Sequence, residues 1–415
     1  MNRIEYINIY ISSKCNGKCT YCYLPDKKKI APYNKEIREW LSTNKYITDI
    51  EEVYENKIRA IGFWGAEPLF NLDCIDIDKL LLSFSELDEI IISSGFISKI
   101  NLLEDFIKRL NDYTINYKRK MLLSIQVSFD GNEEMNDIFR GKGTTKKVLA
   151  NLDRIIDFLN SLKFLNLKIR ISSGSTISNE MLDYLVEDFP DHQNFFHTLS
   201  DKLIKNINED KKDNILINFL LHNKLATGTI NYSKEDGIKY SKIQSREWEK
   251  RTKKSFKGFV QERFNILQTF KQRTECAAGI TSFCIAPDKS VHLCHRTFDY
   301  IIPEILKNNS SMNNFVFYDK EKLLHYAYLL TSNLNFRINI NQAIIKELIE
   351  CGEISEIYRN PFYSYILARH IATKFYCYMD NIYETGSYNV QSINLFKVYG
   401  NGALEYHIKN VMENL

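Results

Sequence analysis

The sequence predicts an α/β fold in which a partial (β/α)6 barrel of the TIM type precedes a smaller C-terminal α+β domain. The first half of the chain alternates short β-branched runs with segments of helical periodicity. Such alternation indicates parallel strands joined by right-handed crossovers. After about residue 230 the alternation stops, and a β-hairpin at 276–296 and a mainly helical remainder are expected. We therefore expect a barrel domain at 1–235 and a second domain at 236–415.

Six segments of the first half have the length and composition of buried strands. They are residues 4–11, 57–63, 89–93, 122–128, 165–171 and 214–220. Between them, apolar residues recur at helical spacing, as at Val148, Leu152, Ile155 and Leu159. In a barrel of this kind the active site lies at the C-terminal ends of the strands. The residues that follow each strand are therefore the first candidates for function.

Composition and charge exclude several classes of protein. Hydrophobic residues make up 44% of the 415-residue chain, and 16 Gly and 7 Pro are too few for a fibrous or linker-dominated protein. The net charge of +3 gives no reason to expect nucleic acid as a partner. The chain shows no secretion signal and no run of about 18 apolar residues, so we expect a cytoplasmic protein without a membrane partner. In that compartment the nine cysteines are reduced thiols or metal ligands.

Three cysteines, Cys15, Cys19 and Cys22, follow the first expected strand with the spacing C-x3-C-x2-C. Gly17 between them permits a tight backbone turn, so that the three thiolates can converge on one small cluster. Three thiolates on a [4Fe–4S] cube leave one iron without a protein ligand, and a substrate or cofactor can bind there. The alternative is a structural zinc site that a distant Cys or His completes.

The cysteine loop resembles the cluster motif of the radical S-adenosylmethionine (SAM) superfamily, including an aromatic residue, Tyr21, before the last cysteine. Further along, Gly65-Ala66-Glu67-Pro68 resembles the Gly-Gly-Glu-Pro motif that contacts the methionine amino group of SAM. Ser93-Ser94-Gly95 ends the third strand, and Ser128-Phe129-Asp130-Gly131, followed by Arg140-Gly141, is similar to the segment of peptide- and protein-modifying members that faces SAM. The resemblance implies a [4Fe–4S] cluster and S-adenosyl-L-methionine as cofactors.

Site residues follow from the same resemblance. Cys15, Cys19 and Cys22 are expected to hold the cluster, and the expected SAM contacts are Gly65, Ala66, Glu67, Ser94, Ser128 and Arg170. Ala66 replaces the second glycine of the motif, and the contact is expected to survive because it uses backbone carbonyl and Glu67. For Arg170, a surface or structural ion pair is the alternative, because the odd positions of its strand are the ones expected to be buried.

A second, incomplete set of cysteines falls in and after the expected hairpin. Cys276, Cys284 and Cys294 resemble the hairpin of the SPASM and twitch subgroups, which carries an auxiliary iron–sulfur cluster. The resemblance implies one auxiliary cluster, and its candidate ligands are Cys276, Cys294, Cys377 and either Cys284 or Cys351. Packed free thiols are the alternative. His295 is the candidate catalytic base, and a plain hydrogen-bonding histidine is its alternative.

The resemblance implies an oxidoreductase that cleaves SAM reductively to a 5′-deoxyadenosyl radical. That radical abstracts hydrogen from a peptide or protein side chain, for oxidation, crosslinking or epimerisation. A reductant such as flavodoxin or ferredoxin is implied as a partner. One alternative is a radical SAM enzyme that acts on a small molecule, a nucleotide or RNA. Another is a non-catalytic iron–sulfur redox sensor, which leaves the Glu67 and Ser128 segments without a purpose.

Overall fold

The structure is a computed structural model of the 415-residue chain. It describes residues 6–22, 31–53, 58–219, 223–225, 282–285, 291–292 and 316–317, with single residues at 239, 342, 346, 350, 359 and 361. The chain divides into two compact units. The first comprises Met1–Ile177, Pro190–Ala226 and Thr281–Leu323, and the second comprises Ser178–Phe189, Thr227–Ile280 and Leu324–Leu415. The mainly helical remainder expected after the hairpin lies almost entirely outside the described residues.

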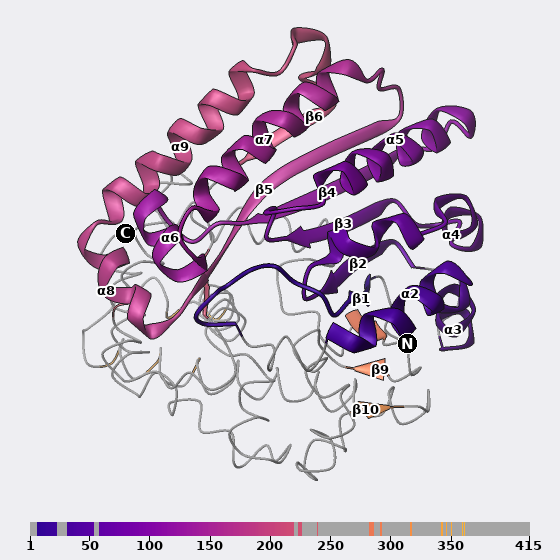
Figure 1. Cartoon of the computed structure of the whole chain (residues 1–415), viewed down its shortest axis with the longest axis horizontal. Helices are drawn as coiled ribbons and strands as arrows, with labels where there is room; N and C mark the ends of the chain where they lie inside the picture. The colour runs from indigo at the N-terminus through magenta and orange to yellow at the C-terminus, as the bar shows by residue number, and fades with distance from the viewer. Residues whose placement is uncertain are drawn as a thin grey trace. The chain divides into compact units, whose positions relative to one another are not determined.

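The first unit contains a parallel sheet with the strand order β8-β1-β2-β3-β4-β5-β6 (Figure 1). Its strands are β1 (Tyr6–Ser12), β2 (Ala60–Gly65), β3 (Glu89–Ser94), β4 (Met121–Ser128), β5 (Leu167–Ile177), β6 (Ile215–Asn218) and β8 (Ser282–Ile285). The six strands expected from the sequence are confirmed. A short strand, β7 (Asn223–Leu225), pairs with the far end of β5. The six consecutive parallel strands place their carboxyl ends along one edge.

The expected hairpin is confirmed in its described residues, but it belongs to the same sheet as the barrel strands. β8 pairs antiparallel with β9 (Val291–His292), which in turn pairs with β10 (Val316–Phe317). β8 also pairs in parallel with β1, with Cys284 opposite Asn8. A boundary at 235/236 therefore does not separate the hairpin from the sheet, because the free edge of β1 accepts β8 as its neighbour.

Helices cover one face of the sheet in this unit. They include α2 (Asn34–Ser42), α3 (Lys45–Val53), α4 (Ile77–Ser83), α5 (Ile100–Asn116), α6 (Glu133–Arg140), α7 (Thr144–Ser161) and most of α9 (Phe189–Lys205), with short 3-10 turns η1 (Ala31–Tyr33), η2 (Pro68–Cys74) and η3 (Glu209–Lys211). α8 (Asn179–Glu187) falls in the second unit. Figure 1 shows α5 and α7 lying along β3, β4 and β5. No helix in the described ranges is long and apolar enough to cross a membrane.

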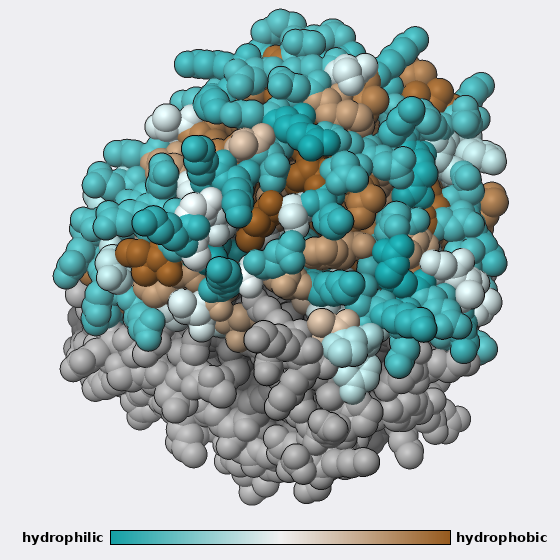
Figure 2. All heavy atoms as spheres, viewed as in Figure 1, coloured by the Kyte–Doolittle hydropathy of each residue, from teal (hydrophilic) through white to brown (hydrophobic). Residues whose placement is uncertain are grey.

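The core lies between the strands and these helices. Alternate strand residues such as Ile9, Phe63 and Ile125 are fully buried, and the ring of Phe63 meets Phe106 of α5 edge-on at 6.1 Å. This period-two burial fits strands that pack one face against helices. Outside this core, hydrophilic side chains cover most of the described surface in the view of Figure 2.

The opposite face of the sheet carries polar and small residues. Trp64 Nε1 donates a hydrogen bond to the Tyr6 hydroxyl at 3.2 Å, and that hydroxyl donates to Asn8 Oδ1 at 2.7 Å. Further across the sheet, Ser93 Oγ donates to Gln126 Oε1 at 3.1 Å. This polar face ends at the same edge as the cysteine loop.

Candidate active site at the carboxyl ends of the strands

The three cysteines of the first motif lie in the loop that follows β1. Cys15, Cys19 and Cys22 have thiol side chains of intermediate exposure. The Gly17 backbone N–H donates to Cys15 Sγ at 3.2 Å, and a Cβ added to Gly17 would stand 3.2 Å from Cys15 Sγ and 3.6 Å from Cys19 Sγ. Glycine therefore keeps a space beside both sulfurs that any other side chain would fill.

Three soft sulfur donors on one loop are the donor set that iron–sulfur clusters use, so these residues fit the cluster that the sequence implies. Among the residues that the structure describes, no three Cys, His, Asp or Glu side chains are gathered closely enough to hold a single metal ion.

A backbone clamp joins the end of β2 to the end of β1. Gly65 has φ +136°, and a Cβ at this position would lie 2.3 Å from the Ser12 carbonyl oxygen. The Ala66 backbone N–H donates to the same carbonyl at 2.7 Å. Only glycine allows both this φ value and this close approach. The clamp places the Ala66–Glu67 segment beside the start of the cysteine loop.

Glu67 brings a buried carboxyl group to this edge of the sheet. Only 4% of the residue is exposed, and its oxygens accept hydrogen bonds from the backbone N–H groups of Leu69, at 3.3 Å, and Gly95, at 2.9 Å. Burial raises the pKa of Glu67 to about 7, and hydrogen bonds from Ser94, Leu69 and Gly95 oppose part of that rise. Glu67 and Ser94, two expected SAM contacts, therefore meet at the ends of β2 and β3.

Replacing Glu67 with Gln should remove a pH dependence from the stability of the apo-protein. The native carboxyl keeps its proton up to about pH 7, whereas the unfolded chain loses it near 4.5. The unfolded state thus binds fewer protons in this window, and the free energy of unfolding falls with rising pH by up to about 3 kcal/mol. Urea denaturation between about pH 5 and about pH 7 measures the slope. The exposed Glu134→Gln variant should keep the wild-type slope, and an unchanged slope in Glu67→Gln would contradict the prediction.

Ser128 ends β4 at the same level as these groups. It is half-buried and pairs with Gly174 of β5. With Glu67 and Ser94 it completes a row of polar residues at the ends of β2, β3 and β4. The structure therefore brings five of the six expected SAM contacts, Gly65, Ala66, Glu67, Ser94 and Ser128, to one edge of the sheet.

The sixth expected SAM contact, Arg170, lies away from this edge, in the earlier part of β5. It pairs with Ser124, four positions before the Ser128–Gly174 pair, which is roughly 13 Å along a strand. Its Nη1 atom lies 3.8 Å from Glu89 Oε1, and 43% of its side chain is exposed. Ser124 Oγ donates to the same Glu89 oxygen at 2.8 Å. This position fits the ion-pair alternative for Arg170 rather than a contact with SAM.

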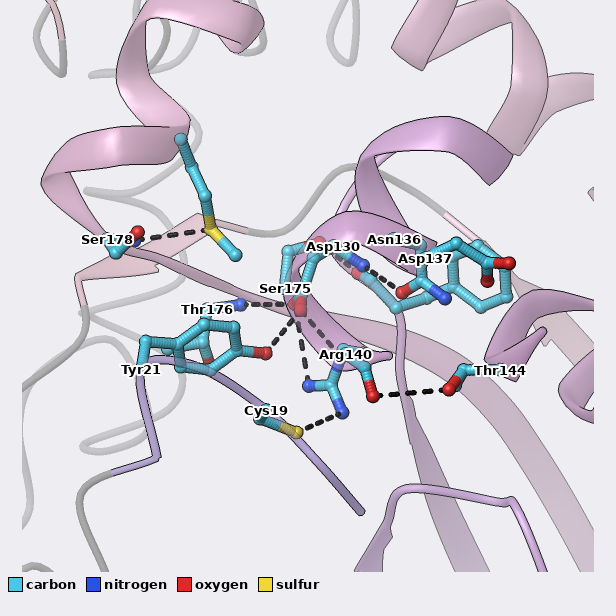
Figure 3. Close-up of polar contacts among 12 residues, drawn as sticks. Cys19, Tyr21, Asp130, Asn136, Asp137, Arg140, Thr144, Ser175, Thr176 and Ser178 are labelled. Carbon is cyan, nitrogen blue, oxygen red and sulfur yellow. Dashed lines mark hydrogen bonds and ion pairs between the residues drawn. The ribbon is translucent and has the colours of Figure 1, made fainter. Parts of the chain in front are cut away.

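A buried ion pair between Asp130 and Arg140 lies behind the cysteine loop (Figure 3). Arg140 Nε is 2.6 Å from Asp130 Oδ2, and Arg140 Nη1 is 3.8 Å from Cys19 Sγ. The Tyr21 hydroxyl donates to Asp130 as well. Sequence reasoning gave Asp130 and Arg140 no role of their own. The signal that could have found them is two oppositely charged residues, each followed by glycine, in the segment after the fourth strand.

The second cysteine set is described at one position only. Cys284 lies in β8 with its side chain buried. Cys276, Cys294, His295, Cys351 and Cys377 lie outside the described residues, so the auxiliary cluster and the histidine base stay predictions.

The chain is an α/β protein with an open parallel sheet. One edge of this sheet carries three thiols, on the loop after the first strand, that fit an iron–sulfur cluster, and a buried carboxyl after the second strand. Residues 9–187 match the family model of the radical SAM superfamily. This part of the chain is similar to radical SAM domains.

Several curated proteins match parts of the chain. The GTP 3′,8-cyclase of Desulforamulus reducens is 27% identical over 86 residues, which is 21% of this chain and 25% of the relative. The radical SAM cyclopropyl synthase TigE of Paramaledivibacter caminithermalis is 23% identical over 199 residues, 46% of this chain and 39% of the relative. The GTP 3′,8-cyclase of Hydrogenovibrio crunogenus is 25% identical over 188 residues, which is 45% of this chain and 52% of the relative. The matches thus span from a quarter to about half of the relatives' length.

Two solved structures are also similar. The structure of anSMEcpe with bound AdoMet has a TM-score of 0.43 and 15% identity and covers 77% of this chain and 79% of its own. The structure of Streptococcus suis SuiB bound to S-adenosylmethionine has a TM-score of 0.36 and 14% identity. The match covers 71% of this chain and 61% of the SuiB chain.

Proposed function

We propose that this chain is a radical SAM enzyme that cleaves SAM reductively and abstracts hydrogen from a peptide or protein side chain. The observation that carries the SAM part of the proposal is the meeting of the cysteine loop, the Gly65 clamp and the buried Glu67 carboxyl at one edge of a parallel sheet. When bound there, a [4Fe–4S] cluster and SAM supply the radical chemistry.

The residues of the chain hold and orient these groups. Cys15, Cys19 and Cys22 ligate the cluster through their thiolates. Glu67, with the backbone at Gly65 and Ala66, receives the amino group of SAM, and the approach of that cation favours the ionised carboxylate. Gly95 N–H and Ser94 fix the orientation of the Glu67 carboxyl, and Ser128 contacts the ribose or the carboxylate of SAM.

A peptide or protein substrate is supported by the hairpin. Its sequence resembles the hairpin that carries an auxiliary cluster in peptide- and protein-modifying enzymes. It also pairs with β1, the strand that leads directly into the cysteine loop. In this proposal cysteines of the second set would hold one auxiliary cluster, and that cluster would supply electron-transfer chemistry.

A nucleotide or another small molecule is the second candidate substrate. The GTP 3′,8-cyclases named above match part of this chain. The polar sheet face also offers hydrogen-bonding groups, such as Asn8, Trp64 and Gln126, of the kind that fix a small polar ligand.

The first test is the iron and sulfide content of the anaerobically reconstituted protein. We expect the wild type to bind iron for two clusters, and a Cys15, Cys19 and Cys22 triple-alanine variant to bind iron for one. With dithionite and SAM, only the wild type should form 5′-deoxyadenosine. Cys74→Ala, which removes a buried thiol in η2, should behave as the wild type.

Each outcome changes the proposal in its own way. A wild type that binds iron but forms no 5′-deoxyadenosine would favour the redox sensor. If the triple variant binds no iron, the proposal of an auxiliary cluster is contradicted and the small-molecule substrate becomes the better candidate. Stimulation of 5′-deoxyadenosine formation by GTP, with none by a cysteine-rich test peptide, would do the same.

A further inference from the structure

Arg140 occupies an unusual position between a buried carboxylate and a cysteine of the candidate cluster site. Its side chain is 7% exposed and that of Asp130 is 0% exposed. Its guanidinium points one nitrogen, Nε, at Asp130 and another, Nη1, at Cys19 Sγ (Figure 3). Arginine suits this task because its planar fork can bind two partners at once.

Asp130 holds the guanidinium in place because the carboxylate is itself fixed from two sides. The Thr176 backbone N–H in β5 donates to its Oδ1 at 2.9 Å, and the Tyr21 hydroxyl in the cysteine loop donates to its Oδ2. The backbone N–H of Asp130 in turn donates to Asn136 Oδ1 in α6 at 3.1 Å. Segments that lie more than 100 residues apart in sequence thus hold the Asp130–Arg140 ion pair next to the Cys19 thiol.

The guanidinium keeps its charge in this setting. Arginine is charged at every ordinary pH, and Asp130 lies 2.6 Å from its Nε atom as a counter-charge. The guanidinium carbon of Arg140 also lies 5.8 Å from the centroid of the Tyr21 ring. This cation–π contact is a second favourable interaction for the positive charge. A fixed positive charge therefore stands beside Cys19.

We propose that Arg140 is a positioning residue that raises the reduction potential of the cluster through Cys19. Hydrogen bonds to ligand sulfurs and nearby positive charge stabilise the more negative, reduced state of an iron–sulfur cluster. One electron passes from a carrier of the flavodoxin or ferredoxin class, or from dithionite, to the cluster, and no bond forms or breaks in that step. This inference rests on the proposed function, since it needs the cluster to be bound.

A merely structural role is the competing explanation. The Thr20 backbone N–H donates to the Phe139 carbonyl at 2.9 Å, so the cysteine loop is also tied to α6 by backbone contacts. A structural role predicts changes in folding and iron content but leaves the potential of the retained cluster unchanged. The midpoint potential is therefore the measurement that separates the two roles.

The experiment compares midpoint potentials of reconstituted variants, followed by electron paramagnetic resonance during redox titration, with iron content measured first. Arg140→Lys retains the charge, Arg140→Gln removes it, and Asp130→Asn/Arg140→Gln removes both charges, so that no carboxylate is left unpaired. We expect the potential to be nearest the wild type in Arg140→Lys, more negative in the double variant and most negative in Arg140→Gln. Arg154→Gln, which breaks an exposed ion pair with Glu104, is the control and should not shift it.

The outcomes separate this inference from the proposed function. A wild type that binds no cluster contradicts the proposed function. Equal potentials in the wild type, Arg140→Gln and the double variant overturn the inference and leave the proposed function standing. Loss of the cluster of the cysteine loop from Arg140→Lys and from the double variant, while circular dichroism shows both folded, also overturns it, because Arg140 would then be needed for ligation.

Discussion

Replacing Asp130 with Ala is expected to lower the free energy of unfolding of the apo-protein by about 3–5 kcal/mol. The carboxylate is fully buried and holds Arg140, Tyr21 and the Thr176 backbone N–H. Its removal leaves the Arg140 cation, whose side chain is 7% exposed, without its counter-charge, and such a buried charge is costly. Urea denaturation under reducing conditions, followed by tryptophan fluorescence, measures the change.

An exposed ion pair provides the matched control. Lys202 and Asp153 also form an ion pair, at 2.7 Å, but their side chains are 50% and 40% exposed. Lys202→Ala should change the free energy of unfolding by at most about 1 kcal/mol. Equal effects of the two substitutions would mean that burial does not set the strength of the Asp130–Arg140 pair.

Gly65→Ala is expected to destabilise the sheet domain by at least about 2–3 kcal/mol and to disturb the cluster site. The added methyl group would meet the Ser12 carbonyl oxygen at 2.3 Å, on a backbone with φ +136° that alanine rarely adopts. Relief of the clash must move β2 away from the end of β1, which breaks the Ala66–Ser12 hydrogen bond. Urea denaturation gives the loss of stability, and iron content after reconstitution reports the damage to the cysteine loop.

Gly143→Ala separates the two causes of this effect. Gly143 also has a positive φ, +76°, but nothing lies within 4 Å of the position of an added Cβ. Replacing Gly143 with Ala should lower the free energy of unfolding by about 1 kcal/mol, because only the strain of a positive φ in alanine opposes it. A Gly65→Ala variant as mild as Gly143→Ala would show that the β1–β2 clamp has room to move.

Local patterns predicted the strands and the positions of most candidate residues. Each strand needs only a few adjacent residues of alternating or continuous apolar character, and each motif residue follows a strand end directly in sequence. That is why Cys15, Glu67 and Ser94 could be assigned to one edge of the sheet before the fold was known. The same reasoning left two roles open for Arg170, and its ion-pair partner, Glu89, could not be predicted because it lies in a different strand.

The class of fold, the cysteine loop and the order of the motifs can be predicted from residue order, because they depend on periodicity and short spacing. Three features emerge from the folded chain instead: β8 pairs with β1, burial raises the pKa of Glu67 to about 7, and Arg140 contacts Cys19 across 121 positions of sequence. Strand pairing, desolvation and charge contacts of this kind depend on which distant segments fold against one another. No local pattern of residues encodes them.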